Sequence, residues 1–333
     1  MSLEVGNSSE PVKCLKADAQ SDPRFFMARF GVRIFFLLML STLAVGSAFA
    51  AAKKDKKSGE DTGPTAFQIV SAAPQSAWRT VDTDNLLMMD LPSGEVFIEM
   101  RPDLAPQHVE RIKTLTRQGF YNGLKFHRVI EGFMAQGGDP KGDGTGGSPL
   151  PDLPGEFVHD ASAIQPFSLI GRDRIASRIG FSKGLPIAAE PASLRSIRAD
   201  RRVLAWPAHC PGVMSMARAT NPNSANSQFF LMIGDARSSL DQRYTVWGLI
   251  VDGVENSRRI SRGEPPKRPT PIIRMQMVSD MPVSDRPNIE VLSTSSDIFT
   301  RYLKRAELIN ENGLVKDLCN IRAPRRINGK VEL

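Results

Sequence analysis

Short runs of alternating apolar and polar positions recur along the chain from residue 85 onward. Residues 85–100 predict two strands joined at 92–94, where Pro, Ser and Gly are typical turn residues, and Val96, Ile98 and Met100 alternate with their neighbours. Further strands are predicted at 123–130, 212–218, 227–234, 244–251 and 271–278. Many short strands with few helices are typical of an antiparallel sheet closed as a barrel or a sandwich.

Two helices accompany these strands. Residues 103–123 place Val109 and Ile112 on one face, and Pro106 suits the first turn of a helix. Residues 251–261 predict a second helix. We therefore expect a mainly β domain with two helices that cap it.

Two segments do not fit a compact barrel. Residues 158–211 are rich in Arg, Ser, Ala and Pro and are far longer than an ordinary connection between strands. We expect them to project from the barrel, so that their deletion leaves a folded domain. Residues 286–333 read as a charged C-terminal tail, with an amphipathic helix at 297–309.

The N-terminal region reads as a targeting sequence. Residues 27–50 combine two arginines, an apolar run and the small-x-small triplet Ala-Phe-Ala, which is the pattern of a secretory signal peptide. The apolar run is shorter than the roughly 20 residues that a membrane span needs. We expect cleavage near Ala50-Ala51 and export, to the periplasm if the source is a Gram-negative bacterium. An uncleaved membrane anchor is the alternative.

Two stretches flank this signal. Residues 1–26 form an upstream extension, because Met27 is a suitable start for the signal peptide. Residues 51–66 are charged and rich in small residues, which predicts a flexible linker.

Composition and charge narrow the function only slightly. The net charge is +7, and no basic stripe is interleaved with aromatic residues, so we expect no nucleic-acid partner. After cleavage only Cys210 and Cys319 remain. An exported compartment permits a disulfide, but the sequence leaves open whether these two cysteines pair or stay free.

Several familiar chemistries lack their motifs. "GDGTGG" at 142–147 is followed by prolines rather than a helix, so we interpret it as a glycine-shaped loop and not a dinucleotide site. The four histidines lack metal-ligand spacing, and His127 is interpreted as a core residue. Ser227 has no nucleophile elbow around it, which argues against a serine hydrolase. We expect neither a metal nor a cofactor.

One stretch keeps polar residues where only apolar ones are expected. "FHRVIEGFMAQGGDP" at 126–140 places Arg128 and Gln136 among Phe126, Phe133 and Met134. Charged residues are seldom buried without a partner. Arg128 is therefore either paired inside the fold or available to something that docks there.

At this point the residues resemble a known family. "GFYNGLKFHRVIEGFMAQGGDP", "GDGTGG", "PGVMSMARATNPNSANSQFFLMIGD" and "LDQRYTVWGLIVDGVE" are similar to the cyclophilins, the peptidyl-prolyl cis-trans isomerases. The similarity covers about residues 85–280 apart from 158–211. It implies a closed eight-stranded antiparallel barrel with a capping helix at each end, within an isomerase domain at 67–285, and an active groove outside the barrel.

The resemblance also implies the roles of individual residues. Arg128 matches the catalytic arginine of the family. The residues that match the substrate groove are Phe133, Met134, Gln136, Ala217, Arg218, Gln228, Phe230, Leu240 and Tyr244. Ser239 stands where many cyclosporin-sensitive members have tryptophan, and Tyr244 stands where they have histidine. These departures put cyclosporin sensitivity in doubt more than catalysis.

The predicted function is isomerisation of X–Pro peptide bonds, assisting the folding of exported proteins. The partners expected are proline-containing polypeptides and unfolded exported proteins, with no stable membrane association after signal cleavage. The alternative is a cyclophilin-fold binding, scaffold or chaperone module with little catalysis.

Overall fold

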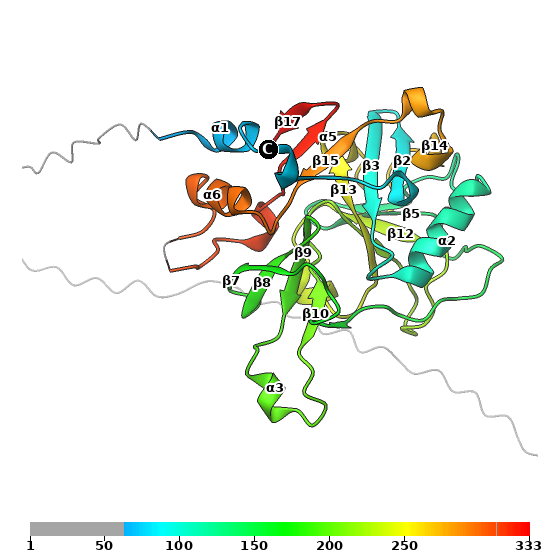
Figure 1. Cartoon of the computed structure of the whole chain (residues 1–333). Helices are drawn as coiled ribbons and strands as arrows, with labels where there is room; N and C mark the ends of the chain where they lie inside the picture. The colour runs from blue at the N-terminus through cyan, green and yellow to red at the C-terminus, as the bar shows by residue number, and fades with distance from the viewer. Residues whose placement is uncertain (1–62, 311) are drawn as a thin grey trace, which may run out of the picture. The chain divides into compact units, whose positions relative to one another are not determined.

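The computed structural model describes residues 63–310 and 312–333, drawn in colour in Figure 1. The expected extension and signal peptide (1–50) and most of the expected linker lie outside the described residues. The end of that linker enters helix α1 (Ala66–Ser71). In the part of the chain that is described, no helix has the length and apolar character needed to cross a membrane.

Eight antiparallel strands form the main sheet, in the order β14-β2-β3-β13-β11-β12-β5-β4. In chain order they are β2 (Leu86–Leu91), β3 (Gly94–Met100), β4 (Arg128–Ile130), β5 (Met134–Gly137), β11 (Val213–Met216), β12 (Phe229–Met232), β13 (Val246–Asp252) and β14 (Arg274–Met277). All but β5 overlap the runs that predicted strands. Ile98, Phe126 and Trp247 belong to the fully buried core of this sheet.

The prediction of a closed barrel was wrong, because the sheet is curled but open. Its order begins at β14 and ends at β4, and no ladder joins these two edges within residues 63–310 and 312–333. Isolated contacts join the segments next to these two edges, such as the hydrogen bond from the Gly123 N–H to the Ile272 carbonyl at 2.7 Å. The facing segment contains Pro269 and Pro271, and a proline has no N–H to donate to a ladder.

Helix α2 (Pro106–Arg117) confirms the helix predicted at 103–123. Pro106 occupies its first turn, and Ile112 is among the residues that it buries against the main sheet. The second predicted helix is a single turn, α5 (Val254–Ser257). Another single turn, α4 (Arg237–Leu240), follows β12.

The insertion at 158–211 forms a five-stranded antiparallel sheet of its own. Its strands, in the order β6-β10-β9-β8-β7, are β6 (His159–Asp160), β7 (Ser168–Gly171), β8 (Arg178–Ser182), β9 (Leu185–Ala189) and β10 (Leu204–Pro207). Phe181 and Ile187 are fully buried in a hydrophobic cluster that also contains Val213 of β11 and Phe299 of the C-terminal segment. The expectation that the whole insertion projects was therefore wrong.

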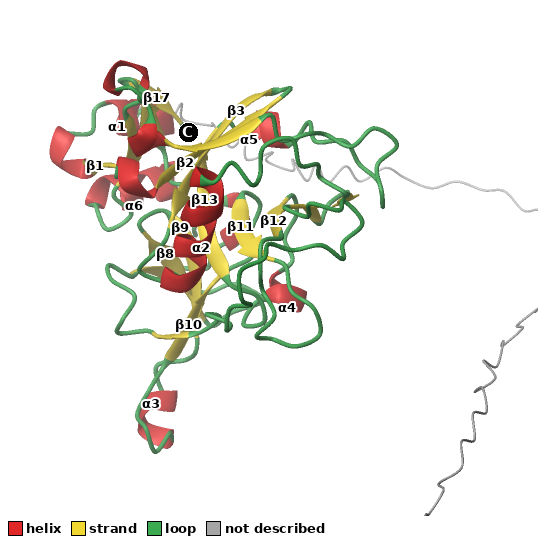
Figure 2. Ribbon diagram, turned by 90° about the vertical axis from the view of Figure 1, so that its right-hand side faces the viewer, coloured by secondary structure: helices red, strands yellow, loops and turns green. Residues whose placement is uncertain are grey.

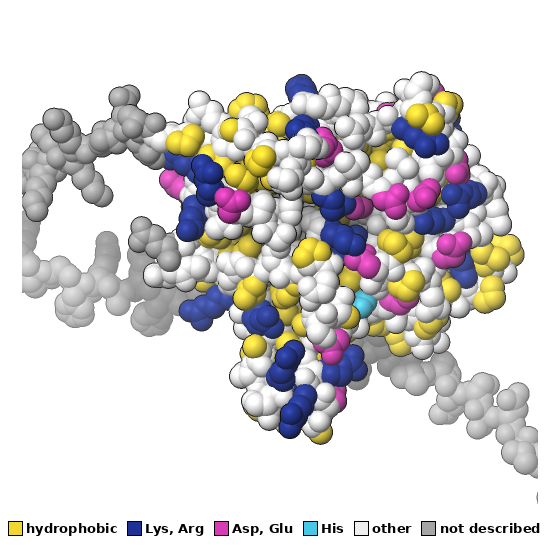
Figure 3. Space-filling model, viewed as in Figure 1, with side chains coloured by type: hydrophobic (Ala, Val, Ile, Leu, Met, Phe, Trp, Pro, Cys, Tyr) yellow, Lys and Arg dark blue, Asp and Glu magenta, His cyan; other side chains and the backbone are white. Residues whose placement is uncertain are grey.

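Only an arm of the insertion extends away from the rest. Residues 190–203 lead out from β9 and back to β10 and carry the one-turn helix α3 (Leu194–Ile197), as Figures 1 and 2 show. Arginine side chains gather on this arm in Figure 3, and Arg195 and Arg201 are among its exposed residues.

Residues 286–333 are folded, which corrects the expectation of a charged tail. They contribute β15 (Ile289–Leu292), β16 (Arg325–Ile327) and β17 (Lys330–Glu332) to a sheet whose order is β1-β15-β16-β17, where β1 is Trp78–Thr80. The amphipathic helix predicted at 297–309 is α6 (Asp297–Arg305), which buries Phe299 and Leu303 and packs against α1. Short 3-10 helices are η1 (Gln75–Ala77), η2 (Thr83–Asn85), η3 (Val278–Asp280), η4 (Val283–Asp285) and η5 (Leu318–Asn320).

A covalent link and an ionic link join the main sheet, the insertion and the C-terminal segment. Cys210, just before β11, forms a disulfide with Cys319 (S–S 2.06 Å), which answers the pairing question that the sequence left open. Arg237 of α4 has only 2% of its side chain exposed, and its ion-pair partners include Asp173 of the insertion and Asp317 of the C-terminal segment. The insertion and the C-terminal segment are thus parts of one packed structure.

Candidate active site

Arg128 begins β4 and lies on the outer face of the curled sheet, with 43% of its side chain exposed. It is directly opposite Gln136 of β5, which in turn is opposite Phe230 of β12. Residues opposite one another in neighbouring strands lie on the same face of a sheet. The strand register therefore brings Arg128, Gln136 and Phe230 into one row across the outer face.

A pocket of about 150 Å³ opens beside this row. Its lining consists of Arg128, Phe133, Met134, Gln136, Ala217, Arg218, Phe230, Leu240 and Tyr244. Met134, Phe230 and Leu240 are buried, so part of the wall is apolar and held in place by packing. Such a wall favours a compact apolar group over a charged one. Every residue predicted for the site lines this pocket except Gln228.

Gln228 lies in the adjoining pocket, which it shares with Gln136. The Gln136 Nε2 donates to Gln228 Oε1 at 2.8 Å. The Gln228 Nε2 donates in turn to the carbonyls of Gly144 and Gly146, at 3.0 and 2.8 Å. The glycine-shaped loop predicted at 142–147 thus forms the rim of the groove.

The buried carboxylate of Asp139 anchors this loop from below. It accepts hydrogen bonds from the N–H groups of Lys141 at 2.8 Å and Gly144 at 2.6 Å. Burial on its own raises the pKa of Asp139, but these N–H groups outweigh burial, and the pKa lies below its ordinary value. The anchor is therefore charged at neutral pH, the state in which it accepts these hydrogen bonds.

Aromatic contacts stiffen the opposite wall of the pocket. Tyr244 meets Phe230 edge to face, with ring centroids 5.7 Å apart. The guanidinium of Arg218 covers the Tyr244 ring at 4.4 Å, and its Nε donates to the Arg243 carbonyl at 3.0 Å. Arg218 and Tyr244 thus support each other.

Arg128 has a partner that sequence reasoning missed. Its Nε donates to Glu264 Oε2 at 2.8 Å, and Glu264 is about half exposed. The proline-rich loop that follows α5 carries Glu264 and is held to β4 by a bridge between Gly263 and Val129. No other hydrogen bond of Arg128 forms among residues 63–310 and 312–333, so both of its Nη groups lack an acceptor within these ranges.

Other candidate groups do not belong to this site. His127 is buried and burial lowers its pKa, in keeping with the predicted core histidine. In the described ranges, the one trio of possible metal ligands is Asp235, Asp317 and Cys319. The sulfur of Cys319 is already bonded to Cys210, so this trio lacks a free thiolate.

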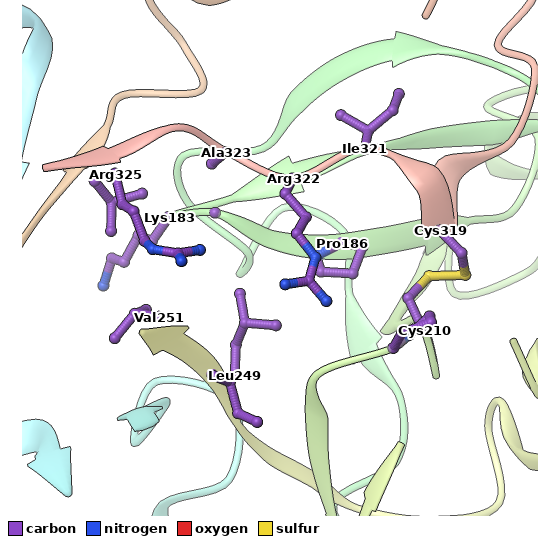
Figure 4. A pocket seen from close by; sticks show the side chains of 14 residues that line it. Lys183, Pro186, Cys210, Leu249, Val251, Cys319, Ile321, Arg322, Ala323 and Arg325 are labelled. Carbon is purple, nitrogen blue, oxygen red and sulfur yellow. A yellow bond between two sulfur atoms is a disulfide. The ribbon is translucent and has the colours of Figure 1, made fainter. Parts of the chain in front are cut away.

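A second pocket lies where the main sheet, the insertion and the C-terminal segment meet (Figure 4). It is lined in part by Pro186, Leu249 and Arg322, with the Cys210–Cys319 disulfide at one side. Its cavity of about 40 Å³ has room for a few water molecules at most. It is too small to accept a peptide segment, so it does not compete with the pocket beside Arg128.

The fold and this site together define a class of protein. A curled antiparallel sheet carries on its outer face an apolar pocket, a guanidinium and a polar rim. This arrangement can hold a small apolar ring within an extended peptide while it presents a cation to the peptide backbone. Proline is the amino acid whose side chain is such a ring.

Comparison with known proteins agrees with this class. Residues 86–279 match the family described as cyclophilin type peptidyl-prolyl cis-trans isomerase/CLD. A probable peptidyl-prolyl cis-trans isomerase of Brucella suis is 36% identical over 231 residues, which cover 65% of this chain and 93% of that protein. The crystal structure of cyclophilin AquaCyp293 from Hirschia baltica is 38% identical with a TM-score of 0.66, covering 75% of this chain and 93% of that one.

The chain therefore belongs to the cyclophilin-type peptidyl-prolyl cis-trans isomerases. The resemblance carried by the run at 126–140 is confirmed, and with it the prediction of an isomerase. The likeness to AquaCyp293 covers more of the chain than the family match at 86–279 does. Segments outside the common cyclophilin domain are thus shared with that structure.

Proposed function

We propose that Arg128 is the residue that catalyses rotation about X–Pro bonds in this isomerase. Rotation about such a bond faces a barrier of about 20 kcal/mol, which amide resonance sets. As the bond twists, its nitrogen becomes pyramidal and gains a lone pair. A guanidinium directed at that nitrogen stabilises the twisted amide more than the planar one, which accelerates the reaction.

The other residues of the site hold the substrate. The wall formed by Phe133, Met134, Phe230 and Leu240 would grip the pyrrolidine ring, and Gln136 would bind the adjoining carbonyl. The edge of the chain at Ala217 and Arg218 would hydrogen-bond the flanking peptide, so that rotation occurs about one bond. The observation that carries this proposal is that Arg128 and the apolar wall line the same pocket.

A protease-coupled isomerisation assay on a short X–Pro peptide tests this proposal. We expect the unmodified protein to accelerate cis-to-trans conversion at catalytic concentrations. The competing function is a binding or scaffold module of the same fold. That module would bind the peptide, detected by a titration, without raising the rate of conversion.

We further propose that the clients are exported proteins that must isomerise proline bonds while they fold. The signal-like sequence at 27–50 supports this role. The Cys210–Cys319 disulfide supports it independently, because disulfides persist in oxidising compartments and are rare in the cytosol.

Export predicts a shortened chain. We expect the mature protein to begin near Ala51, because the small-x-small triplet at 48–50 has the pattern that signal peptidase cleaves. Mass spectrometry of the protein recovered from its native host measures the N-terminus. A chain that retains residues 27–50 in the membrane fraction would contradict the proposal of cleavage.

Cyclosporin should inhibit this isomerase far less than it inhibits sensitive cyclophilins. Ser239 occupies the position of an expected tryptophan, and its Oγ donates to the Ala236 carbonyl at 3.1 Å within α4. The drug thus loses a large apolar contact and an indole donor. We expect Ser239→Trp to restore part of the inhibition, measured as the drug concentration that halves activity. Tight inhibition of the unmodified protein would show that Ser239 is not the equivalent position.

A further inference from the structure

The carboxylate of Asp241 is linked to the candidate proline pocket through neighbouring residues. Its side chain is only 8% exposed, and it accepts three hydrogen bonds. The Trp206 indole donates from Nε1 to Oδ2 at 3.0 Å, and His209 donates to Oδ1 from its backbone N–H and from Nδ1, both at 2.9 Å. Hydrogen bonds to an ionised group are stronger than neutral ones, so this cluster holds Asp241 firmly.

Asp241 adjoins the pocket through two neighbours. Leu240, which lines the pocket, is the residue before Asp241 at the end of α4. The His209 ring stacks on Phe230, another pocket residue, with centroids 6.2 Å apart and an interplanar angle of 25°. A shift of the carboxylate would therefore move two apolar residues of the pocket, Leu240 and Phe230.

The cluster is also connected to Tyr244, a third residue of the pocket, through Ser215 and Thr245. The Nε2 of His209 is 3.1 Å from Ser215 Oγ, and that hydroxyl donates to the Thr245 carbonyl at 2.9 Å. Thr245 follows Tyr244, which lines the pocket. Ser215, His209 and Asp241 have the order of a hydrolytic triad, but Ser215 is fully buried, so no substrate can reach its hydroxyl.

The only member of this cluster from the five-stranded sheet of the insertion is Trp206. It lies in β10 opposite Ala188 of β9, so the insertion's own ladder positions its indole. Helix α4 has a single turn and few hydrogen bonds of its own. Without the indole, Oδ2 of Asp241 loses its only direct protein donor among the described residues, and a buried carboxylate in that state turns toward water.

We propose that Trp206 is a positioning residue for the proline pocket, through which the inserted sheet sets the affinity for substrate. The indole fixes Asp241, and Asp241 fixes Leu240 directly and Phe230 through His209. The inference rests on the proposed function, because it assumes that this pocket holds the substrate proline. It assigns the insertion a part in substrate binding without any contact between the insertion and the reacting bond.

The first test is Trp206→Phe, which removes the Nε1 donor and keeps an aromatic ring. Because the pocket wall loosens while Arg128 is untouched, we expect KM for a short X–Pro peptide to rise about three- to tenfold. This is less than the more than tenfold effect of losing a hydrogen bond to a charged group outright, because the indole acts on the substrate only through Asp241. The kcat should stay within about twofold of the unmodified value. Unchanged KM, or a kcat that falls as much as KM rises, would overturn the inference.

Trp78→Phe is the matched control. Trp78 is a buried tryptophan of β1 that stacks under Arg326 at 4.7 Å, and it does not line the pocket. It undergoes the same chemical change, so a general loss of packing would affect both variants. We expect Trp78→Phe to leave KM unchanged even if its melting temperature falls.

The second test measures the unmodified protein and needs no variant. The indole N–H signals of Trp78, Trp206 and Trp247 can be followed by NMR and assigned through their connectivity to the assigned backbone. Saturating X–Pro peptide should shift the Trp206 signal and leave the Trp78 signal in place. Peptide binding with no shift at Trp206 would overturn the inference alone, whereas a protein that neither binds nor isomerises the peptide would overturn the proposed function.

Discussion

Replacing Arg128 by alanine should slow isomerisation by about 10²–10³, the usual effect of removing one preorganised donor from a transition state. Stability should change little. Glu264, the ion-pair partner that the substitution leaves behind, is 50% exposed and can be hydrated. Exposed ion pairs contribute about 0–1 kcal/mol to the free energy of unfolding. The measurement is kcat/KM for a short X–Pro peptide together with the melting temperature of the same sample.

Two further variants separate geometry from charge. Arg128→Lys keeps the positive charge but loses the planar fork, so we expect it to be impaired nearly as much as alanine. Glu264→Gln keeps an acceptor for the Arg128 Nε and should retain most of the activity. Near-native turnover of Arg128→Ala would disprove the mechanism. A loss of activity in proportion to the unfolded fraction would instead assign Arg128 a structural role.

Breaking the Cys210–Cys319 disulfide should lower the free energy of unfolding by about 2–5 kcal/mol. The two cysteines are 109 residues apart, and a cross-link over so long a segment removes much conformational freedom from the unfolded chain. It also ties the C-terminal segment to Cys210, in the short segment before β11. The test is urea unfolding of the Cys210→Ser/Cys319→Ser double variant beside the unmodified protein.

A reducing agent supplies the control for this prediction. Dithiothreitol should shift the urea midpoint of the unmodified protein toward that of the double variant and should leave the double variant unchanged. Equal midpoints for the oxidised protein and the double variant would show that packing alone holds the C-terminal segment. That packing is substantial, since Phe299 and Leu318 are fully buried in the cluster shared with the insertion.

The role of the insertion changes what its deletion is expected to do. Removal of 160–208 would strip Phe181 and Ile187 from the shared cluster and Asp173 from Arg237. Leaving a buried cation without part of its counter-charge is strongly destabilising. We now expect the deletion to impair folding, and only loss of the arm at 190–203 to be tolerated.

The sequence by itself determined the strands of the main sheet apart from β5, and its resemblance to the cyclophilins supplied the set of residues at the pocket. Alternation at 85–100 predicted β2 and β3 because a half-buried strand must present successive side chains to opposite sides. The site residues were assigned through the resemblance, and the structure then places two of them, Arg128 and Gln136, side by side in one hairpin. The hairpin of the insertion also had a signal in the sequence. Lys183 and Gly184 separate two apolar runs, and the structure places both residues at positive φ in the tight turn between β8 and β9.

Only the tertiary structure decided how distant segments meet. Nothing in the residues around Glu264 indicates a contact with Arg128, and nothing around Trp206 indicates one with Asp241. Local patterns report which face of an element is apolar, because that depends on neighbours three or four positions away at most. A hydrogen bond between residues 35 or 136 positions apart depends instead on how whole elements pack, which no local period records.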